Sequence, residues 1–141
     1  MIVPDTNVII RYFVDDDPVQ TRQAEELFAS LSQEEPGFVC RETLLELVWV
    51  LGHTYDYSRA EIAQVLEGLL AATELEIENA DALGAVLHLY ADRGFDFADL
   101  MIRQVSQQRG ADRVLTFDRR AARLEGVELI GAGINQDDPA K

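Results

Sequence analysis

The stretch Ile2-Val3-Pro4-Asp5-Thr6-Asn7-Val8-Ile9-Ile10 contains, in short form, the unit from which the whole fold is built. Ile2-Val3-Pro4 is typical of a short apolar strand, and the apolar run from Val8 to Val14 predicts a helix. Proline lacks a backbone donor, so we expect Pro4 at the end of the strand or on its free side. Asp5 stands between the two elements, at the carboxyl end of the predicted strand.

The same alternation of short strand and helix recurs along the rest of the chain. Asp17 with Pro18, and Ser58 with Glu61, are helix starts, and Gly94 is a helix stop. Further strands are predicted at 38–40, 75–77, 114–117 and 127–130, and helices at about 18–31, 41–55, 59–71, 79–93, 96–108 and 118–124. This order predicts an α/β domain at 1–130 with a mostly parallel sheet, followed by a loose polar tail at 131–141.

Composition excludes several classes of protein. With 141 residues, of which 48% are hydrophobic, the chain fits one domain with its own core. No apolar run is long enough to span a bilayer, and the start has no signal-peptide pattern, so we expect a cytoplasmic protein without a membrane partner. The single cysteine, Cys40, excludes an internal disulfide and a multi-cysteine zinc site.

The net charge is unusual for a protein that would meet nucleic acid. Twelve basic residues stand against 26 acidic ones, which gives −14 at pH 7. Such a surface repels polyanions at long range, because phosphate binding depends on Lys and Arg. An excess of carboxylate suits a site that collects divalent cations, and it also suits a basic partner. A solvated acidic surface that keeps the protein soluble is the alternative explanation.

Two aspartates follow directly after predicted apolar strands. Asp5 follows the first strand, and Asp118 follows the strand predicted at 114–117. Ligands of α/β proteins bind at the carboxyl ends of the strands, so these residues can meet in space although they are far apart in sequence. Each also precedes a predicted helix, so a role as a helix N-cap is the alternative.

Three more carboxylates are candidates for the same site. Asp96 and Asp99 lie on one face of a predicted helix, where Asp96 has the better alternative role as a cap. Glu46 stands in the apolar stretch 44–51, a helix that we expect to be central. A buried carboxylate is costly unless it is paired or binds a metal, and the alternative is that Glu46 lies on a narrow solvated part of the helix or forms a salt bridge. Glu42, one turn earlier, is the rival to Glu46.

Carboxylates that converge on one crevice repel one another, and a divalent cation relieves this repulsion. Ligation by oxygen alone suits Mg²⁺ or Mn²⁺. Such an ion can activate water to attack a phosphodiester and can stabilise charge on the phosphoryl oxygens. The joint pattern therefore predicts metal-dependent hydrolysis of a phosphodiester bond.

Four segments of the chain resemble the PIN domain, and within that family the VapC-type toxins of bacterial toxin–antitoxin pairs. They occur in the family's order and span most of the chain: 3–11 (VPDTNVIIR), 44–51 (LLELVWVL), 96–99 (DFAD) and 115–119 (LTFDR). The resemblance implies a three-layer fold with a parallel central sheet flanked by helices, and cleavage of RNA that depends on Mg²⁺ or Mn²⁺. It also implies a cognate antitoxin and a homodimer.

Carried over position by position, the resemblance assigns the acidic cluster. Its members are Asp5, Glu46, Asp99 and Asp118, of which Asp5 and Asp99 are the expected direct metal ligands. Asp96 matches an acidic position beside them. Thr6 and Asn7 match polar positions that hold the first aspartate and the metal's waters. Pro4 departs from the family, where a plain apolar residue is commoner.

Other functions fit the sequence less well. A phosphatase of the haloacid dehalogenase type would use Asp5 as its nucleophile, but it usually has a second Asp two residues on, where this chain has Asn7. A receiver domain needs a lysine near the last strands, and there is none between 110 and 130. A PIN-like module that only binds RNA or a partner is the remaining alternative, and the full acidic set argues against it.

Overall fold

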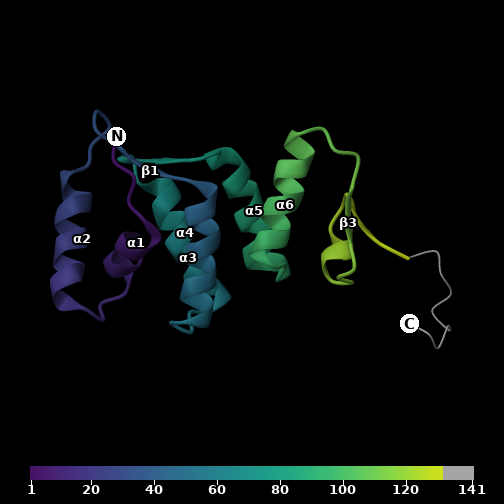
Figure 1. The fold of residues 1–141 in the computed structure, drawn as a ribbon, viewed down its shortest axis with the longest axis horizontal. Coiled ribbons are helices and arrows are strands. Elements are labelled where there is room, and N and C mark those ends of the chain that lie inside the picture. The colour runs from purple at the N-terminus through teal and green to yellow at the C-terminus, as the bar shows by residue number, and fades with distance from the viewer. Residues whose placement is uncertain (132–141) are drawn as a thin grey trace. The chain divides into compact units, whose positions relative to one another are not determined.

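The computed structural model describes residues 1–131, which fall into two compact units: Met1–Gly94, and the described residues from Phe95 onward. The first unit contains α1 (Thr6–Phe13), α2 (Pro18–Ser30), β1 (Gly37–Val39), α3 (Arg41–His53), α4 (Arg59–Ala71), β2 (Leu75–Ile77) and α5 (Ala80–Arg93) (Figure 1). The second contains α6 (Phe97–Gln108), β3 (Val114–Thr116), the 3₁₀ helix η1 (Ala121–Arg123) and β4 (Val127–Leu129). Apart from Gly131, the predicted polar tail lies outside the described residues.

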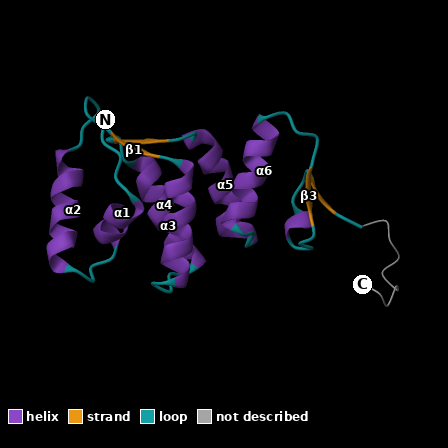
Figure 2. Ribbon diagram, viewed as in Figure 1, coloured by secondary structure: helices purple, strands orange, loops and turns teal. Residues whose placement is uncertain are grey.

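The strands of the first unit are parallel, and β1 is the middle one. Gly37 lies opposite Leu75 of β2, and Ile2 forms a parallel bridge to Gly37. The Phe38 N–H donates to the Ile2 carbonyl at 2.8 Å, whereas the Gly37 N–H donates to the Glu74 carbonyl at 2.9 Å, so β1 has a neighbour on each side. Figure 2 shows the strand pair at one end of the helices of this unit.

The strands of the second unit, β3 and β4, also run parallel. Val114 lies opposite Val127 and Thr116 opposite Leu129, and η1 lies in the connection between the strands. The predicted α/β class with parallel pairing is therefore confirmed. In the described residues the strands form two short pairs, one in each unit, and the Ile2 segment contributes a single bridge.

Helix α4 begins and ends where the sequence predicts. The Ser58 hydroxyl accepts a hydrogen bond from the Glu61 N–H at 3.1 Å, and the Glu61 carboxylate accepts one from the Ser58 N–H at 3.0 Å. This reciprocal pair satisfies two backbone donors that a helix start leaves open. The pKa of the Glu61 carboxyl is lowered, because hydrogen bonds to the carboxylate from the Ser58 backbone and from the Ser58 side chain favour its ionised form.

Helix α3, which the sequence predicted to be central, is buried on one face only. Leu44, Leu47 and Leu51 are 0% exposed, whereas Leu45 is 36% and Trp49 58% exposed. Positions three or four apart return to the same face, so these three leucines form one buried stripe, and α3 contacts α1 and α4. Glu46 is exposed, so of the two positions that the sequence allowed for its side chain the structure shows the solvated one. None of the described helices is long and apolar enough to cross a membrane.

Candidate functional site

Asp5 is the N-cap of α1. Its Oδ1 accepts a hydrogen bond from the Asn7 N–H at 3.0 Å, and the residue is exposed. The capping role that the sequence allowed is thus confirmed, and it uses only one carboxylate oxygen. Oδ2 makes no hydrogen bond with any described residue, so it remains available to a ligand from solvent.

The two residues after Asp5 face in different directions. Thr6 is only 3% exposed, whereas Asn7 is exposed. The Asn7 side chain makes no hydrogen bond within the described part of the chain. Of the two polar residues that follow the aspartate, Asn7 therefore has the side chain that is open to solvent.

Both glutamates of α3 are exposed. Glu42 is in the first turn and Glu46 one turn later, so they share a face. Among the described residues neither of them forms an ion pair, although the adjacent Arg41 binds Glu78 at 2.7 Å. The structure therefore leaves both carboxylates open to solvent and does not separate Glu46 from its rival.

The second unit brings Asp96, Asp99 and Asp118 within electrostatic reach of one another. Asp96 caps α6, where its Oδ1 accepts from the Ala98 N–H at 2.9 Å and the Asp99 N–H at 3.2 Å. Asp99 lies in the first turn and is half-buried. Burial raises the pKa of the Asp99 carboxyl, and the negative charges of Asp96 and Asp118 raise it further.

Asp118 holds the turn after β3. Its Oδ1 accepts from the Arg120 N–H at 2.7 Å and the Ala121 N–H at 3.2 Å, and its own N–H donates to Thr116 Oγ1 at 3.0 Å. The exposed carboxylate thus has a fixed position at the carboxyl end of its strand, as predicted.

These side chains have the chemistry of a site for a hard divalent cation. Within either unit, no three His, Cys, Asp or Glu side chains of residues 1–131 gather closely enough to hold a metal ion. The donor set nevertheless fits Mg²⁺ or Mn²⁺, which bind through one or two carboxylates and keep several waters. A cation beside Asp99 would lower the pKa of its carboxyl and so oppose the effect of Asp96 and Asp118, because positive charge favours the ionised carboxylate.

The arginines differ in their availability for phosphate. Arg11 forms an ion pair with Asp16 at 2.7 Å, and Arg103 Nε donates to the Glu125 carbonyl at 2.6 Å. Arg119, beside Asp118, is exposed and forms no ion pair with a described residue. It is therefore better placed than Arg11 or Arg103 to bind a phosphate.

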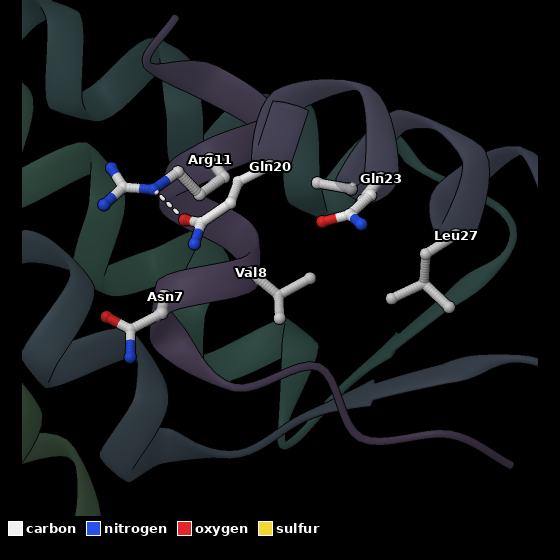
Figure 3. Close-up of a pocket in the computed structure, with 7 residues that line it drawn as sticks. Asn7, Val8, Arg11, Gln20, Gln23 and Leu27 are labelled. Atoms are coloured by element: carbon white, nitrogen blue, oxygen red, sulfur yellow. Dashed lines mark hydrogen bonds between the residues drawn. The ribbon is translucent and has the colours of Figure 1, made fainter. Parts of the chain in front are cut away.

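A cavity of about 360 Å³ that the sequence did not predict lies between α1 and α2, within the first unit (Figure 3). Its lining includes Gln20 and Gln23 of α2. Glutamine on an exposed helix face is common and predicts nothing by itself. What marks these residues is that they lie beside Asn7 of α1, and the sequence does not show this because it does not say how the two helices pack.

The comparisons with known proteins agree with an α/β fold of parallel strands and helices. Residues 2–127 match the family model described as PIN domain. The chain is 30% identical over 121 residues to a VapC ribonuclease from Aquifex aeolicus, and the alignment covers 85% of this chain and 89% of that protein. No solved structure gives a significant match. Because the match contains every candidate carboxylate and elements of both units, this chain belongs to the PIN-domain family.

Proposed function

We propose that this PIN-domain protein is an endoribonuclease that hydrolyses RNA phosphodiester bonds with the help of Mg²⁺ or Mn²⁺. We also propose that it is the toxin of a toxin–antitoxin pair. The observation that carries the proposal is the family match over residues 2–127, together with the likeness to a protein named a VapC ribonuclease. Access to cellular RNA requires that the protein acts in the cytoplasm.

The proposed ligands are the four carboxylates that follow the family pattern. Asp5 and Asp99 would hold the metal directly, and Glu46 and Asp118 would hold it directly or through water. Support comes from the open Oδ2 of Asp5 and from the exposure of Glu46. The raised pKa of Asp99 adds to this support, since an environment that disfavours a lone carboxylate favours one that is paired with a cation.

The other polar residues position these ligands and the attacking water. Asp96 keeps negative charge beside Asp99, and Thr6 orients a water near Asp5. The bound cation supplies positive charge that stabilises the phosphoryl oxygens and activates water. The water oxygen bonds to phosphorus as one bridging P–O bond breaks, the water's proton passes to solvent, and the departing ribose oxygen takes up a proton from solvent. Arg119, beside Asp118, is placed to bind a neighbouring phosphate.

The exposed surface of α3 supports the proposal that this protein binds other protein chains. Leu45 and Trp49 are exposed apolar side chains on one helix, and Trp49 stacks on His53 with ring centroids 4.6 Å apart. Exposed apolar side chains that gather on one face are typical of protein interfaces. We propose a homodimer and a cognate antitoxin, and the net charge of −14 favours an antitoxin with a basic segment.

The test compares wild type with Asp5→Asn on single-stranded RNA in Mg²⁺ or Mn²⁺. Asp15→Asn, an exposed aspartate in the loop between α1 and α2, is the matched control. We expect cleavage by wild type and the control, and its loss in Asp5→Asn and in EDTA. Expression in growing cells should be toxic for wild type and tolerated for Asp5→Asn. If Asp5→Asn and the EDTA-treated protein cleave as fast as untreated wild type, the proposal fails.

A further inference from the structure

The cavity between α1 and α2 has two kinds of wall. Val8, Ala24 and Leu27 provide apolar surface. Figure 3 shows Gln20 and Gln23 along the α2 side and Asn7 at one end. The volume of about 360 Å³ lies within the range of small-molecule sites, which combine apolar walls with a few placed polar groups.

Arg11, the cation among the described residues that line the cavity, is already neutralised. Arg11 Nη1 binds Asp16 at 2.7 Å and Tyr55 Oη at 3.1 Å, and its Nε donates to Gln20 Oε1 at 2.7 Å. The hydrogen bond with Tyr55, and with it the charge of Asp16, raises the pKa of Arg11, so the guanidinium stays charged and paired. The cavity therefore has no surplus positive charge with which to select a phosphate.

The uncommitted polar groups at the cavity are amides. The side chains of Asn7 and Gln23 form no hydrogen bond with any other residue in the part of the chain that the structure describes. An amide offers a donor and an acceptor side by side and carries no charge. This combination, above an apolar wall, suits a flat neutral ligand with alternating donors and acceptors on its edge, which describes a nucleobase.

We propose that this cavity binds one base of the RNA and gives cleavage a base preference. The inference rests on the proposed ribonuclease function. Proteins read single-stranded RNA by hydrogen bonds to the edges of splayed bases. Asn and Gln pair bidentately with adenine, so adenine is the preferred base. The place of the cavity supports this, because Asn7 lines it and also donates its N–H to the proposed catalytic Asp5 at 3.0 Å.

The experiment measures cleavage of a random-sequence single-stranded RNA pool at low salt, followed by sequencing of the cut ends. Wild type should favour adenine at one fixed position relative to the cut by about tenfold or more, the discrimination of a good bidentate contact. Gln23→Leu, which keeps bulk but removes the amide, should bring this ratio close to one. Gln64→Leu, the same change at an exposed position of α4, should leave it unchanged.

A second readout separates this inference from the proposed activity. Asp5→Asn in EDTA is mixed with the same RNA pool, and the retained RNA is sequenced. In one outcome, wild type cleaves no RNA while the RNA retained by Asp5→Asn is enriched in adenine and Gln23→Leu removes this enrichment. In that case the ribonuclease proposal fails, and the proposal that the cavity binds a base stands. An identical base pattern in Gln23→Leu, or no base preference in either readout, overturns the inference and leaves the cavity to a protein partner.

Discussion

Asp5 carries two separable roles, and a pair of substitutions distinguishes them. The Asp5 carboxylate accepts the Asn7 N–H at 3.0 Å as the cap of α1. In Asp5→Asn the new amide oxygen can accept the same bond, whereas the methyl group of Asp5→Ala cannot. Loss of such a cap costs about 1 kcal/mol, and replacement by another good cap costs far less. In a chain of 141 residues this lowers Tm by roughly 2–5 °C for Asp5→Ala and by little for Asp5→Asn.

Cleavage should respond differently from stability. Both variants lose the proposed metal ligand, so both should lose at least about 100-fold in single-turnover rate, because even outer-shell changes at metal sites cost about 10–100-fold. Tm is measured in EDTA by calorimetry, and the rate with labelled RNA in Mg²⁺. If Asp5→Asn keeps the wild-type rate, Asp5 is not a metal ligand and acts only as a cap.

Three further predictions concern stability. Asp99→Asn should raise Tm at pH 7 in the absence of metal, because the raised pKa of Asp99 means that its ionised carboxylate destabilises the folded state. The gain in Tm should be full at a pH above the pKa of Asp99 in the folded protein. It should shrink as the pH falls through that pKa and vanish below the ordinary value of 3.8. Leu47→Ala should cost about 2–5 kcal/mol in urea unfolding, whereas the exposed Leu45→Ala should cost within about 0.5 kcal/mol; equal losses would contradict the one-sided burial of α3. Ser58→Ala should cost about 0.5–2 kcal/mol by loss of the hydrogen bond from the Glu61 N–H to the Ser58 hydroxyl, and an unchanged urea midpoint would contradict this.

Local signals in the sequence predicted the elements well. Ser58 with Glu61 fixed the start of α4, and Gly94, with φ of 71°, ends α5 in the left-handed conformation that glycine adopts readily. The parallel pairing followed from the alternation of strands and helices. The pairs themselves could not be predicted, because the partner of β1 depends on contacts between segments far apart in sequence.

Burial and local charge were harder to predict. Glu46 lies in an apolar stretch, but a helix exposes whichever face has no neighbour, and sequence alone does not say which face that is. Asp96 proved to be a cap, as its place before Phe97 allowed. The effect of Asp118 on the pKa of Asp99 needed coordinates, because Asp99 lies in α6 and Asp118 in the turn after β3.

The central claim is that Asp5 and Asp99 act together in one metal-dependent reaction. The most direct test is a double-mutant cycle on the single-turnover cleavage of one labelled RNA in Mg²⁺, with wild type, Asp5→Asn, Asp99→Asn and the double variant. Residues that act as a unit lose activity non-additively. We expect each single variant to lose at least about 100-fold and the double variant to be about as slow as the slower single variant. Losses that multiply, or a single variant that keeps the wild-type rate, would contradict the claim.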